Sequence, residues 1–284
     1  MSTRSIRDVL TGGPMLVAPG AYDGVTATLI AQAGFNGLYM TGAGTSASLG
    51  YPDFGLLTMT EMVDNARRIT STVDIPLIAD ADTGYGNELN VFRSVQAFER
   101  AGVSAIHIED QVFPKRCGHL DDKELISLDD YLAKIRAAAA ARRSKEFVII
   151  ARTDARAVEG FDAAVSRVNA ALAAGADMAF VEAPQTLEEV EAVPKLVKGP
   201  CLLNVVHNGK TPSLDLTWAE KVGYRIAIVP GLLLRTVIGA CDEALVELKS
   251  ANRHPTPRNF NQTPAQMFAR FGAEAWNERR TKFR

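Results

Sequence analysis

Short apolar runs recur along the whole chain, and an amphipathic stretch follows each of them. The runs consist almost entirely of Val, Ile, Leu and Ala, as is typical of parallel strands that are buried on both faces. They predict eight strands, at residues 15–18, 37–41, 76–82, 105–110, 147–153, 178–183, 201–206 and 225–229. Helical spacing predicts helices at residues 25–33, 59–72, 88–101, 128–143, 163–174, 187–196, 214–222 and 232–249, several of which end at glycine.

One phrase, a helix ending in Ala-Gly followed by an apolar strand, occurs three times, starting at Ala33, Ala101 and Ala174. Three copies of one unit indicate a repeated β–α module. Eight strands with helices between them are most simply a (β/α)8 barrel, or TIM barrel, which takes about 250 residues as a single domain. A doubly wound open sheet uses the same units and is the alternative. We assign residues 1–251 to the barrel.

Residues 252–284 form a C-terminal tail of a different character. The tail is basic, with seven Lys or Arg residues against two Glu. Met267, Phe268, Phe271 and Trp276 recur at roughly helical spacing and give it an aromatic face. Because a lone helix cannot bury such a face, we expect the tail to pack on the barrel or on a neighbouring subunit.

The composition excludes several classes of protein. The chain has 284 residues, 47% of them hydrophobic and 23% charged, and its formal net charge is −2, so nothing favours nucleic acid or an anionic membrane as a partner. No apolar run approaches the roughly 18 residues that span a bilayer, and no signal-like segment opens the chain. The three cysteines form no CxxC pair, which favours a reducing compartment. We therefore expect a soluble, cytoplasmic protein.

Polar residues gather where the predicted strands end. In a barrel the carboxyl ends of all strands meet on one face, and that face carries the chemistry. The residues there are Tyr39, Thr41, Asp80, Asp82, Glu109, Arg152, Asp154, Glu182 and Asn204. A buried strand gains nothing from a terminal carboxylate unless a partner compensates its desolvation. One such residue can cap the following helix, but so many together predict an active site.

The acidic residues at these ends indicate a metal. Asp80 and Asp82 are two positions apart, so on a strand they point to the same face. Two carboxylates that close together repel each other unless a cation lies nearby. Glu109 and Glu182 are within reach, and no histidine cluster accompanies them, so the ligands are all oxygen. Such a set selects Mg²⁺, or Mn²⁺, over zinc. The alternative is an acidic cluster that caps helices.

A basic loop follows the fourth predicted strand, where residues 115–119 read Lys-Arg-Cys-Gly-His. We expect the two cations and the histidine to lower the pKa of the Cys117 thiol and to make it a proton donor or a nucleophile. The glycine allows an unusual backbone, as a mobile loop over a site requires. The alternative is a solvated basic loop with an incidental cysteine. Cys201 and Cys241 fit positions in the core.

Together these residues resemble those of the isocitrate lyase/phosphoenolpyruvate mutase superfamily. The run at residues 115–119 is similar to the signature of its carbon–carbon lyase branch. The resemblance covers most of residues 10–240, through Gly-Ala-Tyr-Asp at 20–23, Leu-Gly-Tyr-Pro-Asp at 49–53, Asp-Ala-Asp-Thr-Gly-Tyr-Gly at 80–86, Ile-Glu-Asp at 108–110 and Ala-Arg-Thr-Asp at 151–154. It implies a (β/α)8 barrel, Mg²⁺, a small 2-hydroxy or 2-oxo dicarboxylate as substrate, and a dimer or homotetramer whose eighth helix is swapped between subunits.

The resemblance also implies a role for each residue of the site. Asp82 is the expected direct metal ligand, and Asp53, Asp80 and Glu109 are expected to hold metal-bound waters. The expected substrate-binding residues are Tyr39, Thr41, Gly42, Ala43, Arg116, Gly118, His119, Arg152, Glu182 and Asn204. Cys117 is the expected general acid and Tyr39 the expected base, and the other expected catalytic residues are Lys115, His119 and Arg152.

Two segments separate the branches of the superfamily. Thr-Gly-Ala-Gly at 41–44 and Asn-Gly-Lys-Thr-Pro at 208–212 resemble the 2-alkylmalate lyase and oxaloacetate hydrolase branch, whereas Pro-Gly-Leu-Leu-Leu at 230–234 lacks a polar residue typical of the hydrolases. The expected function is therefore Mg²⁺-dependent cleavage of a 2-alkylmalate-type acid, of the 2,3-dimethylmalate or 2-methylisocitrate class, to pyruvate and a short carboxylic acid. The alternatives are an oxaloacetate hydrolase or decarboxylase, and a barrel without catalysis that serves as a binding or structural subunit.

Overall fold

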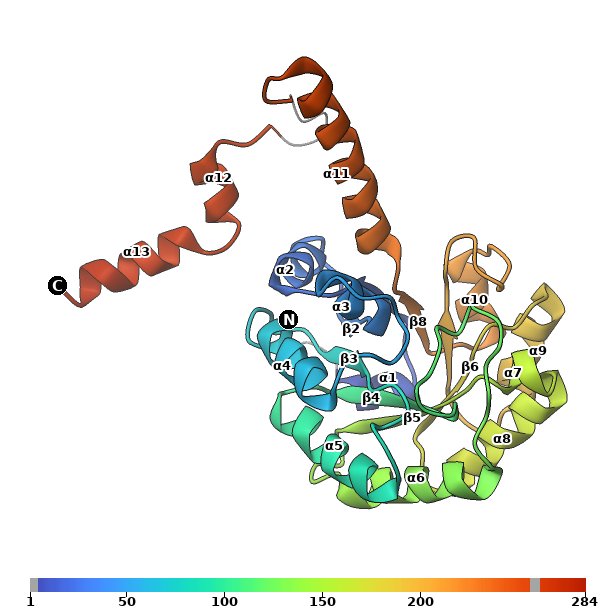
Figure 1. Ribbon diagram of the computed structural model, residues 1–284. Helices are drawn as coiled ribbons and strands as arrows, with labels where there is room; N and C mark the ends of the chain where they lie inside the picture. Colours follow the sequence, from blue (N-terminus) through green and yellow to red (C-terminus); the bar gives the residue numbers. More distant parts are fainter. Residues whose placement is uncertain (1–4, 256–260) are drawn as a thin grey trace. The chain divides into compact units, whose positions relative to one another are not determined.

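Residues 5–255 and 261–284 are described by the computed structural model of this chain. Eight parallel strands pair in chain order, and β1 closes the barrel by pairing with β8 (Figure 1). The strands are β1 (Leu16–Ala21), β2 (Leu38–Met40), β3 (Leu77–Asp80), β4 (Ala105–Glu109), β5 (Val148–Thr153), β6 (Met178–Val181), β7 (Cys201–Asn204) and β8 (Ile226–Val229). The closed ring confirms the predicted barrel and excludes the open sheet.

Each strand overlaps one of the predicted apolar runs, and the two differ only at their ends. The third run extends to residue 82, whereas β3 ends at Asp80. Asp82 has a φ of +46°, a left-handed conformation that strand residues do not adopt. Asp82 therefore belongs to the loop after β3, which decides where its carboxylate can lie.

Helices precede, separate and follow the strands along the chain. They are α1 (Ile6–Thr11), α2 (Gly24–Gln32), α3 (Gly42–Ser48), α4 (Met59–Thr70), α5 (Glu88–Arg100), α6 (Leu128–Ala141), α7 (Ala155–Val158), α8 (Phe161–Ala173), α9 (Leu187–Leu196), α10 (Leu216–Val222), α11 (Leu232–Ala251), α12 (Pro264–Ala269) and α13 (Ala273–Lys282). Within residues 5–234, three short helices, α1, α3 and α7, lie outside the predicted set. The small residues of α3 carry no apolar periodicity, and it begins where the Thr41 hydroxyl accepts a hydrogen bond from the Gly44 N–H, at 3.3 Å.

The core consists of a filled barrel and an outer layer. Inward-facing side chains from the strands form one hydrophobic cluster, in which Tyr39, Ile150 and Phe180 are buried. Ile6 and Val9 of α1 belong to the same cluster, so α1 packs against the barrel interior. Other clusters lie between the strands and the surrounding helices. A packed interior leaves the strand ends as the place where polar groups can meet.

The chain divides into two compact units, residues 1–234 and residues 235–284. The division falls inside α11, earlier than the expected boundary after residue 251, because most of this long helix groups with the tail. Residues 256–260 of the expected tail lie outside the described residues. No side chain described in α11 is buried, and Cys241 is exposed rather than in a core position as expected.

The aromatic residues of the tail lie on two short helices rather than on one. Met267 and Phe268 belong to α12 and Trp276 belongs to α13, while Gly272, with a φ of +79°, separates the helices. The side chains of Phe268 and Trp276 are 56% and 67% exposed. The packing of this aromatic face on the barrel or on a neighbouring subunit stays a prediction.

In the parts of the chain that the structure describes, every helix is too short or too polar to cross a membrane.

Candidate active site

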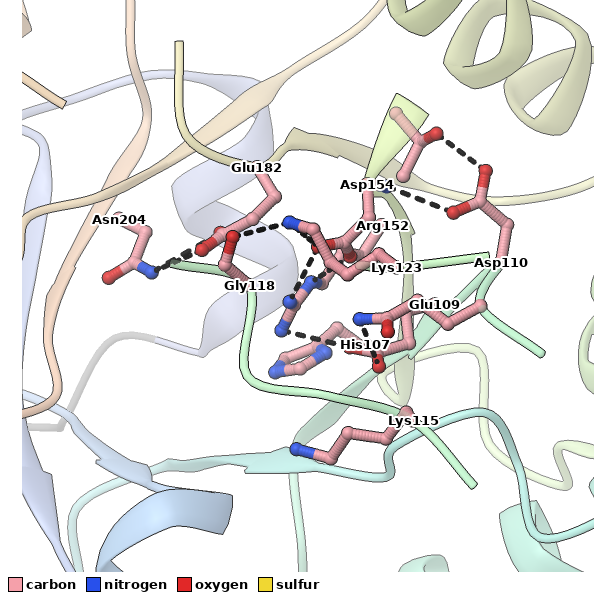
Figure 2. Close-up of polar contacts among 12 residues, drawn as sticks. His107, Glu109, Asp110, Lys115, Gly118, Lys123, Arg152, Asp154, Glu182 and Asn204 are labelled. Carbon is pink, nitrogen blue, oxygen red and sulfur yellow. Dashed lines mark hydrogen bonds and ion pairs between the residues drawn. The ribbon is translucent and has the colours of Figure 1, made fainter. Parts of the chain in front are cut away.

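Polar side chains from six strand ends and from the loop after β4 are buried together. Figure 2 shows those from β4 to β7 and from the loop. The buried members of this group are Tyr39, Thr41, Asp80, Asp82, Glu109, Lys115, Arg152, Asp154, Glu182 and Asn204. Charges that are removed from water must be balanced by one another or by a ligand. The pairing of these groups therefore shows which of them are satisfied and which are not.

Asp80 connects the ends of β2 and β3. Its Oδ2 atom accepts hydrogen bonds from the Tyr39 hydroxyl, at 3.3 Å, and from the Gly42 N–H, at 3.2 Å, while its Oδ1 atom accepts one from the Asp82 N–H, at 3.0 Å. A Cβ atom on residue 42 would lie 2.5 Å from Oδ2, so only glycine allows this approach. Although burial opposes ionisation, the nearby His107 and Lys115 lower the pKa of Asp80 to about 2.

Lys115 lies between two carboxylates. Its Nζ atom is 2.5 Å from Asp53 Oδ1 and 3.0 Å from Asp82 Oδ1. Burial and the charges of Asp80 and Asp53 raise the pKa of Asp82 to about 6, even though Lys115 acts in the opposite direction. The carboxylates here outnumber the cation, so this half of the site has an excess of negative charge.

Arg152, at the end of β5, is held on two sides. Its Nη1 atom lies 3.0 Å from Glu109 Oε2, and its Nε and Nη2 atoms donate to Asp154 at 3.0 and 3.3 Å. The guanidinium also lies over the ring of Phe180, 5.3 Å from its centroid. Burial raises the pKa of Glu109 well above its usual value, against the effect of Arg152. The guanidinium of Arg152 is therefore fixed in direction.

His119 has a defined tautomer. Its Nδ1 atom accepts a hydrogen bond from the Lys210 N–H at 3.0 Å, so in the neutral ring the hydrogen is on Nε2. Nε2 lies 3.2 Å from Glu182 Oε1, and the Asn204 side-chain amide donates to both oxygens of Glu182 at 3.2 Å. Burial lowers the pKa of His119, against the effect of Glu182. The ring is thus a neutral donor aimed at Glu182.

The prediction that the Cys117 thiol has a lowered pKa is wrong. Burial, followed by the charge of Asp53, raises the pKa of Cys117 to about 11, and the hydrogen bond with the His119 backbone and the charge of Lys115 do not offset this. The reason is geometric, because Lys115 is engaged by Asp53 and Asp82, and the side chain of Arg116 is half exposed. A thiol of this kind keeps its proton, which suits a general acid and disfavours a nucleophile.

Arg116 does not reach the other site residues. Its guanidinium lies 3.7 Å from exposed Asp122, while its backbone N–H and C=O are bound by the side chain of buried Gln111. Gln111 also donates to Glu109 Oε1 at 3.0 Å. With its backbone fixed in this way, the side chain points to water, where its charge is better solvated. Ala43 is half-buried in α3, beside Gly42.

Several buried polar residues of the site are missing from the sequence prediction. The Nε2 atom of His107 lies 2.8 Å from the Tyr39 hydroxyl, and Gln111 and Lys123 hold the loop. The sequence does contain a signal for His107, because a polar residue there interrupts an otherwise apolar strand. The sequence contains no such signal for Lys123, because a lysine among acidic residues in a loop is usually solvated.

The donors at the strand ends fit a hard cation in their chemistry. Asp82 Oδ1 and Glu109 Oε2 are buried without a hydrogen bond to them, and each faces only an ammonium or guanidinium group. Within residues 5–255 and 261–284, no three Asp, Glu, His or Cys side chains converge as direct ligands of one ion. One or two carboxylates with water completing the shell is the arrangement that Mg²⁺ prefers. The residues therefore fit Mg²⁺ held largely through water.

The fold and the site define an enzyme of the (β/α)8-barrel class, with buried charges and a cysteine-bearing loop at the strand ends. Residues 6–249 match the phosphoenolpyruvate phosphomutase family, and the chain belongs to that family. This match confirms the resemblance to the phosphoenolpyruvate mutase/isocitrate lyase superfamily that the sequence motifs indicate.

Relatives named as lyases are similar to this chain over most of their length. The chain is 46% identical to 2,3-dimethylmalate lyase of Eubacterium barkeri over 247 residues, which are 87% of this chain and 84% of that protein. It is 44% identical to 2-methylisocitrate lyase of Aeropyrum pernix over 243 residues, 86% of this chain and 78% of that one.

Solved structures show the same similarity. A crystal structure of 2,3-dimethylmalate lyase has a TM-score of 0.91 and 41% identity, covering 96% of this chain and 91% of that chain. Oxaloacetate acetylhydrolase in complex with 3,3-difluorooxalacetate has a TM-score of 0.92 and 39% identity, covering 97% and 95%.

Proposed function

We propose that this chain is a Mg²⁺-dependent carbon–carbon lyase, which cleaves a 2-alkylmalate-type 2-hydroxy acid to pyruvate and a short carboxylic acid. The 2,3-dimethylmalate and 2-methylisocitrate classes are the candidate substrates, because relatives of those names are 46% and 44% identical to it. The observation that carries the proposal is the position of Cys117. Its loop holds a protonated thiol next to Gly118, whose main chain rests on Arg152 and Glu182.

The thiol supplies the proton that this cleavage requires. When the substrate hydroxyl loses its proton, the alkoxide becomes the ketone of pyruvate and the C2–C3 bond breaks. The electron pair of that bond forms the enolate of the departing acid, whose carbon must then be protonated. Cys117, with a pKa of about 11, keeps its proton at neutral pH and gives it to the more basic enolate.

Tyr39 is the proposed base for the substrate hydroxyl. Burial, followed by the charge of Asp80, raises the pKa of Tyr39 well above its usual value, so the residue is a phenol at rest. It can accept a proton only as it passes its own to a neighbour. His107 Nε2 at 2.8 Å and Asp80 Oδ2 at 3.3 Å are both within reach.

The two ends of the substrate meet different groups. Arg152, at the end of β5, is proposed to bind the pyruvate-like carboxylate, because it carries a buried positive charge. Tyr39 and Thr41, at the end of β2, are proposed to bind the same half of the substrate. Asn204 and His119 are proposed to bind the distal end as neutral donors, by turning toward it N–H groups that are directed at Glu182 in this structure. Glu182 would repel a carboxylate, so its role is to orient those two donors.

Asp82 is the proposed direct ligand of Mg²⁺ (or Mn²⁺), and Asp53, Asp80 and Glu109 act through water. When bound, the ion polarises the carboxylate and hydroxyl of a 2-hydroxy acid. The excess of carboxylates around Lys115 supports this assignment, because a dication offsets their repulsion.

We further propose a cytoplasmic homotetramer, built as a dimer of helix-swapped dimers. The exposed apolar side chains of α11 support an assembly, among them Ile238, Leu245 and Val246 at 50%, 62% and 67% exposure.

A substrate panel tests the function directly. Purified protein with Mg²⁺ is expected to release pyruvate from at least one 2-alkylmalate or from 2-methylisocitrate in a coupled assay, and EDTA is expected to abolish this. If neither the 2-alkylmalates nor 2-methylisocitrate yield pyruvate, the lyase assignment fails.

An oxaloacetate hydrolase or decarboxylase is the second candidate, and the similarity to oxaloacetate acetylhydrolase favours it. The apolar residues at 230–234 count against the hydrolase. Oxaloacetate in the same panel separates the two, because hydrolysis gives oxalate and acetate, whereas decarboxylation gives pyruvate and carbon dioxide.

A further inference from the structure

Lys123 is a buried lysine for which the proposed reaction has no use. It lies on the same loop as Cys117, and its Nζ atom donates to the carbonyl oxygen of Gly118 and to Asp154 Oδ1, the latter at 2.8 Å (Figure 2). The Lys123 and Asp154 side chains are 1% and 0% exposed. A buried ammonium group is costly unless hydrogen-bond partners satisfy it, so this geometry is specific.

Asp154 joins the loop to the substrate-positioning arginine. Its Oδ1 atom accepts hydrogen bonds from both the Lys123 ammonium and Arg152 Nη2. Its Oδ2 atom accepts one from Arg152 Nε at 3.0 Å. One carboxylate thus serves a cation from the loop and a cation from β5. If the loop cation leaves, the balance of charge around Arg152 changes.

The backbone of Asp154 is also held in place. Its backbone N–H donates to Asp110 Oδ1 at 2.9 Å, and Asp110 accepts further hydrogen bonds from the Thr153 hydroxyl at 2.5 Å and from Arg167 Nε at 2.8 Å. These partners lie on β5 and α8, which belong to the rigid barrel. Lys123 therefore attaches the loop to the scaffold and not to another mobile segment.

The other partner of Lys123, the Gly118 peptide, lies directly on the site. A Cβ atom on residue 118 would clash with the carboxylate of Glu182 and the guanidinium of Arg152. The loop main chain therefore covers these two side chains at van der Waals distance. The hydrogen bond from Lys123 to the Gly118 carbonyl holds the Gly118–His119 peptide, one residue after Cys117, in this position.

We propose that Lys123 is a positioning residue that holds the loop of residues 115–123 over the strand ends and couples this position to the orientation of Arg152 through Asp154. The placement of the loop follows from these contacts alone. The consequence for catalysis rests on the proposed function, in which Cys117 delivers a proton to a substrate that Arg152 orients. Lys115 cannot replace Lys123, because Asp53 and Asp82 engage it elsewhere.

The accessibility of Cys117 tests the proposal without any assay of activity. In a Cys241→Ser background, Cys117 is half-buried and Cys201 is buried, so iodoacetamide modification of the Cys117 peptide is followed by mass spectrometry. Lys123→Met is expected to raise this rate by about tenfold or more, because opening of the loop no longer breaks a charged hydrogen bond. Rates are compared over a pH series, so that a change in the thiol pKa is separated from a change in exposure.

Lys134→Met is the matched control. Lys134 is similarly buried and also donates to a backbone carbonyl, but that of Thr83, which lies outside the loop, at 3.0 Å. Its loss is expected to leave the Cys117 rate within about twofold of the parent. An unchanged rate in Lys123→Met, or an equal increase in Lys134→Met, overturns the proposal.

Lys123→Met leaves Asp154 without one of its two cations and can fail to fold for that reason. A second variant keeps the proposal testable in that case. Lys123→Met combined with Asp154→Asn removes both charges, and the same rise in the Cys117 rate is expected, with the same outcomes overturning the proposal.

Turnover is the second readout. With a substrate that releases pyruvate, Lys123→Met is expected to lower kcat by about tenfold or more and to change KM by less, because Arg152 keeps Glu109 as a partner. A normal kcat overturns the coupling to catalysis. If the parent consumes no acid of the panel, the proposed function fails, while the alkylation rates still decide the role of Lys123.

Discussion

Lys115 and Lys123 stand on one loop, and both are buried against carboxylates, but their surroundings differ. Lys115 meets Asp53 and Asp82 in a cluster where negative charge is in excess and Asp82 Oδ1 receives no hydrogen bond. Lys123 meets one carboxylate and one carbonyl group, in a network whose other members are paired. The first cluster is incomplete and suits a cation from outside, whereas the second is complete and holds structure.

The largest expected effect concerns the residue between the two lysines. Cys117→Ser is expected to lower kcat for pyruvate release by about 10²- to 10⁴-fold, the usual contribution of a general acid. KM is expected to change little, because neither lysine cluster is disturbed. Cys241→Ser, on exposed α11, is the control and should keep its activity. Near-normal turnover of Cys117→Ser would contradict the assignment of the thiol.

The next largest expected effect is on the free energy of unfolding, to which the two clusters contribute differently. Arg152→Met leaves Glu109 and Asp154 buried with less compensation and is expected to lower the free energy of unfolding by about 3–5 kcal/mol. Asp82→Asn removes repulsion among carboxylates and is expected to cost less than about 1 kcal/mol, or to stabilise. Urea unfolding in EDTA measures both. Equal losses would show that the two clusters do not differ in the way proposed.

A smaller effect comes from the metal. Mg²⁺ at about 100 times its Kd is expected to stabilise the folded chain by about 2.7 kcal/mol, and Asp82→Asn is expected to abolish most of this shift. Thermal unfolding at fixed ionic strength, with KCl as the control salt, measures it. A shift that survives in Asp82→Asn would place the ion elsewhere.

The smallest effect is a titration. With the pKa of Cys117 at about 11, its alkylation rate should keep rising by about tenfold per pH unit from pH 7 to pH 10. The sign follows from the thiolate being the reactive form, which burial makes scarce below the pKa. A rate that levels off near pH 8 would restore the lowered pKa that the loop sequence suggests.

The sequence predicted the barrel well because its signal is local. Each buried strand needs a continuous apolar run, and these runs alone place Asp80, Glu109, Arg152, Glu182 and Asn204 at strand ends. The short helix α3 escaped prediction because its small residues carry no periodicity. The division of the chain at residue 234 escaped it because α11 looks like any other barrel helix in sequence.

The sequence predicted which residues belong to the site better than it predicted their protonation and pairing. Counting cations near Cys117 gave a lowered pKa, but what matters is which cations are free. Lys115 is engaged by two aspartates and Arg116 is solvated, so burial prevails. Desolvation and pairing depend on neighbours that are distant in sequence, which spacing along the chain does not report.

By itself the sequence determined the eight strands, the residues at their ends and the family, because apolar periodicity and short motifs are properties of neighbouring residues. Only the tertiary structure decided how the charges are shared. It directed Lys115 to Asp53 and Asp82, turned Arg116 to water, kept the Cys117 thiol protonated and buried Lys123 against Asp154. The physical reason is that electrostatic energy in a buried site depends on distances and solvent exclusion, and these exist only when the barrel has closed.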